Sequence, residues 1–209
     1  MSTLVYVGAN VGSSLWSMFD KFDDVYVFEP DPEMFSQLKK RYKQFEWVTL
    51  VNAACANETG KAKFYITPNR VSSSMSTVST TTHPIDHPQM DMREIEVDTI
   101  NLAEYLSDQG VDYIDFYLSD AQGSDLNILK TMQSYIDEKK IDQMYIETHC
   151  DGLYLYTDLN NQFSEFKKIL GDNYEFVHAS LGRLSGKIVK ESDIPEGEYE
   201  WDTLWKVKA

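Results

Sequence analysis

The chain has 209 residues, with 19 Lys or Arg against 34 Asp or Glu, so its formal net charge at pH 7 is −15. With 42% hydrophobic residues, this composition predicts one soluble, well-packed domain over residues 1–209. Such an acidic surface repels phosphate groups, so neither nucleic acid nor an anionic membrane is an expected partner. The sequence has no membrane-length apolar run and no signal-peptide pattern, and the expected location is the cytoplasm.

The two cysteines, Cys55 and Cys150, lie far apart in the sequence and lack CxxC spacing. This pattern supports neither a disulfide framework nor a zinc knuckle. We therefore expect free, buried thiols.

The first half of the chain alternates between strand and helix patterns. Residues 4–7 and 25–28 are short apolar runs typical of strands, and residues 13–22 between them carry apolar side chains at helical spacing. A helix is predicted over residues 32–45, with Asp31 as its N-cap and Pro32 in its first turn. Further strands are predicted at residues 47–51 and 61–67, and a Ser/Thr-rich loop at residues 71–83.

The second half continues the same alternation and ends differently. Residues 174–178 and 203–207 are separated by a polar stretch that contains glycine, which predicts a terminal antiparallel hairpin. Alternating strands and helices predict an α/β fold with a mostly parallel, doubly wound sheet. The other predicted strands are residues 94–97, 113–118 and 144–146, and the predicted helices are residues 100–106, a segment beginning near Gln122, and residues 159–170.

Ligands of such sheets bind beyond the carboxyl ends of the strands. The sequence GANVG at residues 8–12 follows the first strand, and its two glycines let the backbone turn tightly and approach a ligand. The second strand ends in Phe-Glu-Pro, which places Glu29 21 residues after Gly8. An acidic residue at about this interval binds a ribose diol in dinucleotide-binding folds. The glycines and this carboxylate together favour a ligand site over an ordinary turn.

Four motifs, in this order, resemble the FkbM-like family of S-adenosylmethionine-dependent methyltransferases. They are GANVG at residues 8–12, FEPDPE at 28–33, DAQGSDL at 120–126 and YIETH at 145–149. The family motifs usually read DxGANxG, FEPxP and DxEGxExxxLxG, with a glutamate at the end of the next strand. The resemblance spans nearly the whole chain. It implies the class I methyltransferase fold, a Rossmann-like, doubly wound, mostly parallel seven-stranded sheet with a terminal antiparallel hairpin.

Three residues depart from the family motifs. Tyr6 stands where the first acid is usual, Leu118 replaces a common lysine, and Gln122 replaces a usual glutamate. Tyr6 is expected either to pack on the first strand or to face the cofactor sulfonium through its ring. These departures keep open the alternative of a catalytically silent module that binds the cofactor without turnover.

The resemblance implies S-adenosylmethionine as the cofactor and O-methylation as the reaction. We expect the acceptor to be a hydroxyl of a sugar, a glycan or a related small metabolite, and a non-sugar metabolite is the alternative. The short segment before the first strand leaves no substrate cap, so the chain is also consistent with a domain of a multidomain, glycan-modifying protein. The residues expected to bind the cofactor are Gly8, Asn10, Gly12, Glu29, Pro30, Asn52, Ala53, Asp120 and Gln122.

Methyl transfer to a hydroxyl requires alignment of the reacting groups and removal of the hydroxyl proton. Asp120 follows one predicted strand, while Glu147 and His149 end the next with a spacing that points both to one side. We expect these three catalytic residues to converge near the transferred methyl group. Either His149 acts as the general base, or all three bind Mg²⁺ or Mn²⁺, with Asp151 nearby.

Two further features lie near this predicted site. The loop at residues 71–83 is expected to be a mobile lid whose hydroxyls face a polar acceptor. Tyr154 and Tyr156 are expected either to stack on a sugar ring or to pack against the sheet. His83 and His87, each followed by a proline, are expected to belong to the loop rather than to a metal site.

Two other enzyme classes fit the sequence less well. A nicotinamide-dependent dehydrogenase shares the glycine turn and the ribose acid, but the chain lacks GxGxxG spacing there. A nucleic-acid methyltransferase would need a basic groove, and either a Pro-Pro motif after the strand at residues 113–118 or a Pro-Cys nucleophile. The chain instead has Ser119 and Asp120 at that strand end.

Overall fold

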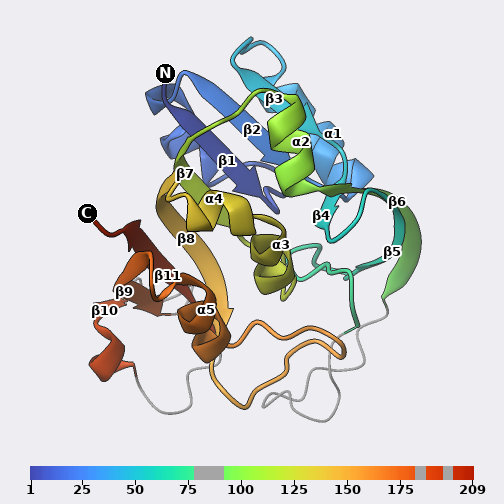
Figure 1. Ribbon diagram of the computed structural model, residues 1–209. Helices are drawn as coiled ribbons and strands as arrows, with labels where there is room; N and C mark the ends of the chain where they lie inside the picture. Colours follow the sequence, from blue (N-terminus) through green and yellow to red (C-terminus); the bar gives the residue numbers. More distant parts are fainter. Residues whose placement is uncertain (78–91, 182–186, 195–199) are drawn as a thin grey trace.

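The computed structural model describes residues 1–77, 92–181, 187–194 and 200–209. Within these residues the centre is an eight-stranded sheet in the order β10-β9-β11-β8-β7-β1-β2-β3 (Figure 1). Along the row β8-β7-β1-β2-β3, neighbouring strands are parallel. β11 is antiparallel to both β8 and β9. The strands are β1 (Thr3–Val7), β2 (Asp24–Phe28), β3 (Val48–Val51), β7 (Ile114–Ser119), β8 (Ile141–His149), β9 (Tyr174–Leu181), β10 (Lys187–Val189) and β11 (Glu200–Val207).

This sheet confirms the predicted α/β class and the antiparallel pairing at the C-terminus. In the described part of the chain it has one strand more than the seven expected, because β10 pairs with β9 at the edge. β10 has only three residues, of which two are apolar, so the sequence pattern is too short to identify it as a strand.

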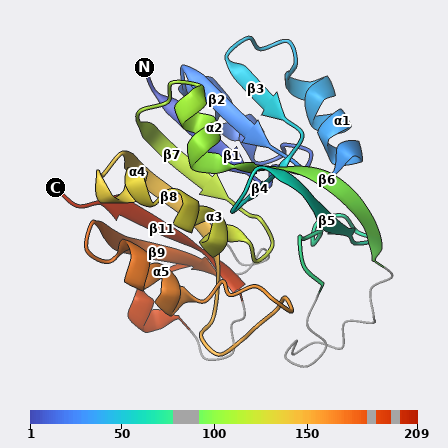
Figure 2. The same ribbon diagram turned by 45° about the vertical axis from the view of Figure 1, so that its right-hand side comes forward.

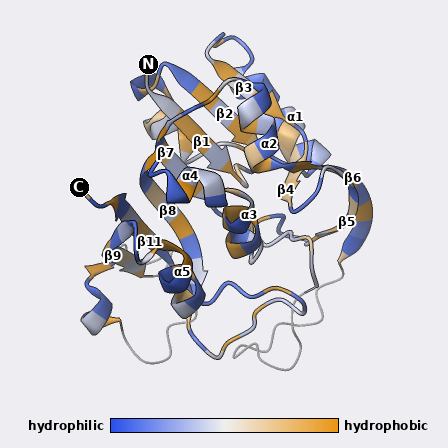
Figure 3. Ribbon diagram, in the orientation of Figure 1, coloured by the Kyte–Doolittle hydropathy of each residue, from blue (hydrophilic) through white to orange (hydrophobic). Residues whose placement is uncertain are grey.

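Helices cover both faces of the sheet (Figures 1 and 2). One face packs against α2 (Leu102–Asp108), α3 (Asp125–Thr131), α4 (Gln133–Asp137) and α5 (Phe163–Leu170), and the other packs against α1 (Pro32–Tyr42). The covering helices carry both hydrophobic and hydrophilic residues, as amphipathic helices must (Figure 3). None of the helices in the described ranges is long and apolar enough to span a membrane.

The segment between β1 and β2 does not form the predicted helix. It contains two 3-10 turns, η1 (Leu15–Ser17) and η2 (Phe19–Lys21). Serine, tryptophan and phenylalanine have modest helix propensity, and the Ser14 side chain makes no capping hydrogen bond. The helix-like spacing instead reflects the burial of Leu15 and Phe19 in the core beneath α1.

A second, three-stranded sheet lies beside the main one, in the order β4-β6-β5 (Figure 2). Its strands are β4 (Ala54–Ala56), β5 (Gly60–Ile66) and β6 (Arg93–Asn101). β5 and β6 were predicted as strands, but β4 was not, and β6 runs on into the start of the expected helix at residues 100–106. Alternation of side chains identifies a strand without identifying its partner, so the separate sheet could not be deduced.

The predicted helix beginning near Gln122 starts later and is interrupted. Gln122 and Gly123 have φ angles of 50° and 91°, which a right-handed helix excludes. The helix therefore begins at Asp125, and Met132 separates α3 from α4. Likewise α5 begins only at Phe163, because the residues before it form a polar turn.

A buried polar pair, Asp125 and Asn161, joins α3 to the end of β8. Asp125 accepts hydrogen bonds from the Ser119 hydroxyl and from the Asn161 amide, the latter at 3.2 Å. The same amide donates to the main-chain oxygen of Glu147 at 2.9 Å, and its oxygen accepts from the Leu126 N–H at 2.9 Å. Because all of these groups are buried, removal of the Asn161 side chain takes one hydrogen bond each from the Leu126 N–H, the Asp125 carboxylate and the Glu147 main-chain oxygen.

Replacement of Asn161 by Ala is expected to lower the free energy of unfolding by at least about 2 kcal/mol, since each buried polar group left unpaired costs about 1–3 kcal/mol. Urea denaturation followed by circular dichroism measures the change. Asn57→Ala, at an exposed position, is the control and should change stability by less than about 0.5 kcal/mol. Equal stability of the two variants would contradict the role assigned to Asn161.

Candidate active site

A cavity of about 450 Å³ lies beyond the carboxyl ends of β1, β2 and β7. The strand order reverses here, because the chain runs from β1 out to β2 and β3 and later places β7 on the other side of β1. Doubly wound sheets bind their ligands at this position. The predicted cofactor residues that line the cavity are Gly8, Asn10, Glu29, Pro30, Ala53, Asp120 and Gln122.

The two glycines of the first motif have different surroundings. Both have φ near +74°. A Cβ atom on Gly8 would collide with the main-chain carbonyl of Asp120, so only glycine lets the ends of β1 and β7 approach this closely. Gly12 lies outside the cavity lining, and its missing side chain makes room for Leu38 and Tyr42 of α1. Gly8 therefore shapes the cavity, while Gly12 serves the packing of α1.

Glu29 directly follows β2 and is buried in the cavity wall. One carboxylate oxygen accepts a hydrogen bond from the Asn10 N–H and the other from the Asp31 N–H, each at 2.7 Å. Burial raises the pKa of Glu29 to about 7, although these two hydrogen bonds lower it. Asn52 lies outside the lining, and its amide donates to the main-chain oxygens of Glu29 and Pro30 at 2.7 and 3.2 Å.

Arg70 also lines the cavity and was missed by the sequence analysis, because a lone basic residue in a polar loop belongs to no motif. Its guanidinium donates to both carboxylate oxygens of Asp31, at 3.0 and 2.7 Å. Asp31 also accepts from the N–H groups of Glu33 and Met34, which confirms it as the N-cap of α1. The Arg70 main-chain oxygen accepts from the Asn10 amide at 2.8 Å. The segment after β5 is thereby joined to both motifs.

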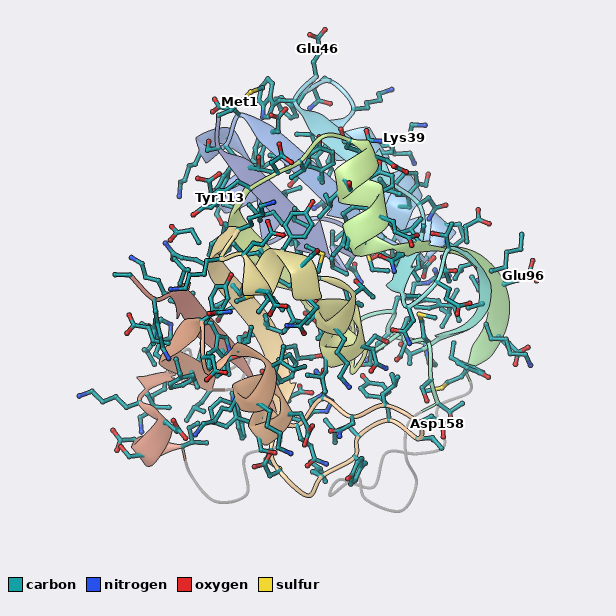
Figure 4. The ribbon with its side chains drawn as sticks, in the orientation of Figure 1. Met1, Lys39, Glu46, Glu96, Tyr113 and Asp158 are labelled. Carbon is teal, nitrogen blue, oxygen red and sulfur yellow. The ribbon has the colours of Figure 1, made fainter. Side chains whose placement is uncertain are left out.

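The described part of the predicted lid, residues 71–77, is hydrogen-bonded to its surroundings. The Ser74 hydroxyl donates to the main-chain oxygen of Gln122 at 2.7 Å, and the Thr157 N–H donates to the main-chain oxygen of Thr77 at 2.9 Å. The partner segment is the loop after β8, in which Figure 4 labels Asp158. Residues 78–83 of the predicted lid, and His83 and His87 with them, lie outside the described residues.

Gln122 connects the ends of β7 and β8. Its amide nitrogen donates to the carboxylates of Asp120 and Glu147, at 2.6 and 3.0 Å, and its oxygen accepts from the Tyr156 hydroxyl at 2.8 Å. The family's usual glutamate at this position would add a third negative charge to the two carboxylates. The neutral amide instead provides a donor to both, which gives a physical reason for this departure.

Tyr156 is buried and does not form an exposed wall for a sugar ring. Its ring stacks on His149, with the two ring centroids 6.0 Å apart, and occupies the space that a side chain on Gly123 would need. Tyr154, by contrast, is 45% exposed. Of the two tyrosines considered for stacking, only Tyr154 presents its side chain to solvent.

The structure brings Glu147 and His149 together with a third residue, Glu200 of β11. Their ligand-type atoms all lie within 4.8 Å of one another. Asp120, which we expected to complete a metal site with Glu147 and His149, is not in this cluster. Burial lowers the pKa of His149 to about 4, so its imidazole is neutral at pH 7.

The sequence analysis also singled out Asp151, Tyr6 and the two cysteines. Asp151 accepts a hydrogen bond from the Ser164 N–H at 2.9 Å, at the start of α5. Tyr6 lines the cavity and is buried, and burial raises its pKa above the usual value. Cys55 is buried and Cys150 is partly buried, and both are free thiols, as expected.

The family model of the methyltransferase FkbM domain matches residues 7–173 of this chain. Similar solved structures include an rRNA methylase from Streptococcus thermophilus, with a TM-score of 0.52 at 9% identity over 100% of this chain and 87% of that chain. A putative methyltransferase from Streptococcus mutans, SMU.1697c, in complex with S-adenosyl-homocysteine gives 0.51 at 6% identity, over 100% and 89%. A search of curated proteins finds no match.

A third similar structure, M. capricolum TrmK in complex with S-adenosyl-homocysteine, has a TM-score of 0.49 at 11% identity. That comparison covers 98% of this chain, which spans only 62% of the length of TrmK. Identities this low show a shared fold, and that fold is the class I methyltransferase fold expected from the motifs. Since the family model extends from the end of β1 to the start of β9, the chain belongs to the FkbM methyltransferase domain family.

Proposed function

We propose that the protein is an S-adenosylmethionine-dependent O-methyltransferase whose acceptor is a hydroxyl of a sugar, a glycan or a related small metabolite. The observation that carries the proposal is the cavity at the strand-order reversal, bounded by the Gly8 turn and the buried carboxylate of Glu29. One similar structure is an rRNA methylase. The net charge of −15 favours a small acceptor over RNA or an anionic membrane for this chain.

The residues of the cavity fit the cofactor. A volume of about 450 Å³ is in the range of small-molecule sites. Each carboxylate oxygen of Glu29 already accepts one main-chain N–H and keeps a second lone pair for a ribose hydroxyl. Gly8 leaves the backbone open to close approach. When bound, the cofactor supplies an electrophilic methyl group on a sulfonium.

Asp120 is the residue whose position best suits removal of the acceptor proton. It directly follows β7 and lines the cavity, whereas Glu147 and His149 lie outside the lining. The Gln122 amide orients the carboxylate through its 2.6 Å hydrogen bond. A carboxylate held at this strand end is a suitable general base for an acceptor hydroxyl. A divalent cation, Mg²⁺ or Mn²⁺ in the sequence-based expectation, is the alternative means of lowering the pKa of the hydroxyl.

The second candidate is a catalytically silent cofactor-binding module. It is favoured by the network in which one amide of Gln122 holds the carboxylates of both Asp120 and Glu147. Calorimetry with S-adenosylmethionine, together with a mass-spectrometric screen of methyl transfer to sugars, glycosides and non-sugar metabolites, separates the two candidates. A methylated product establishes the enzyme and identifies the acceptor, while binding without product from any acceptor favours the silent module.

We expect the affinity for S-adenosyl-homocysteine to rise about tenfold between pH 6 and pH 8. Ribose hydroxyls donate to the ionised form of Glu29, and a group with a pKa of about 7 is ionised for about a tenth of molecules at pH 6 and nine tenths at pH 8. Calorimetric titration over this range measures the change. Glu29→Gln should bind more weakly at pH 8 and lose this pH dependence. Wild-type affinity in Glu29→Ala would contradict the assignment.

Asp120→Asn should reduce methyl transfer by about 10²–10⁴-fold, the range of general acid–base catalysis, with less effect on cofactor binding. Glu147→Gln should reduce it less, because Glu147 is connected to Asp120 only through the Gln122 amide. Rates follow from the methylated product identified in the screen, and affinities from calorimetry. Asp142→Asn, at the opposite end of β8, is the matched control and should leave both unchanged. If the folded Asp120→Asn and Glu147→Gln proteins both kept normal rates of methyl transfer, the reaction would not take place beside these two residues.

A further inference from the structure

We propose that Glu147, His149 and Glu200 bind a divalent transition-metal ion at a site beside the cofactor cavity. None of the three lines that cavity, so the site is separate from the space assigned to S-adenosylmethionine. The cluster also differs from the expected ligand set, because Glu200 takes the place of Asp120. Metal binding here does not depend on the acceptor or on the reaction.

Strand pairing brings the three side chains together. Glu147 and His149 are two residues apart on β8 and therefore point to the same face of the sheet. β11 is antiparallel to β8, and Glu200 pairs directly with His149. Directly paired residues share a face, with Cβ atoms about 5 Å apart. The backbone thus preorganises the cluster, whose ligand-type atoms lie within 4.8 Å of one another.

His149 provides an independent indication of a ligand. Its side chain is only 1% exposed, yet its Nε2 atom has no hydrogen-bond partner among the described residues. Buried polar atoms are nearly always satisfied, so this nitrogen requires an explanation. One imidazole and two carboxylates, with ligand-type atoms within 4.8 Å of one another, form a donor set of the kind found in metal sites. Tyr156 stacks on the ring and limits its rotation.

The donor set selects the class of metal. One imidazole nitrogen and two carboxylates suit Zn²⁺, Mn²⁺ or Fe²⁺ better than Mg²⁺ or Ca²⁺, which prefer oxygen donors alone. A bound cation would also offset the repulsion between Glu147 and Glu200. The Gln122 amide, which donates to Glu147 at 3.0 Å, would orient this ligand from outside the coordination sphere.

The test is calorimetric titration of EDTA-treated protein with Zn²⁺ and with Mn²⁺, in the absence of cofactor and acceptor. We expect one ion per chain, bound at least tenfold more weakly by Glu200→Gln and by His149→Ala. Glu200 is only partly buried, so Glu200→Gln is expected to fold. This variant therefore tests the metal site even if His149→Ala does not fold. Co²⁺ substitution adds a second readout, because nitrogen coordination by His149 changes the visible absorption of the ion.

Two variants serve as controls and should bind metal like the wild type. Glu96→Gln removes an exposed glutamate from β6, outside the cluster (Figure 4). Asp120→Asn distinguishes the cluster from the ligand set expected from the sequence. Absence of stoichiometric binding, or unchanged affinity in Glu200→Gln, would overturn the proposal. S-adenosyl-homocysteine titrations on the same samples show whether cofactor binding fails independently.

Discussion

Carboxylates gather at one edge of the main sheet because β2, β7 and β8 are parallel and all end there. Like charges in a partly buried site repel one another and lose hydration, so each carboxylate requires a compensating group. Glu29 has two main-chain N–H groups, and Asp120 and Glu147 share the Gln122 amide. Two of these donors, the Asn10 N–H and the Gln122 amide, belong to residues with positive φ angles in the turns after β1 and β7.

The segment that follows β5 extends this compensation and covers the site. Arg70 pairs with Asp31, which also caps α1, and Ser74 donates to the main chain at Gln122. The segments that follow β2 and β7 are therefore both hydrogen-bonded to the segment after β5. A ligand that changes the charge or position of either strand end changes the contacts that hold this segment in place.

Sequence reasoning was most successful where a signal is local. The period of apolar residues identified most strands, and the Asp31 cap and the Gly8 turn were recognised from residue types with a single physical explanation. It failed at residues 13–22, where burial produced helical spacing without a helix. It also missed β4, Arg70 and Asn161, because their roles depend on partners distant in sequence.

The sequence by itself determined the fold class, the family and the strand ends at which the cavity lies, since these follow from local patterns in a fixed order. Only the tertiary structure decided which side chains meet there. The pairing of β11 with β8 placed Glu200 beside His149, the burial of Glu29 and His149 altered their pKa values, and Gly12 was assigned to packing. Strand register and burial depend on contacts between distant segments, and a single sequence does not encode those contacts as a readable pattern.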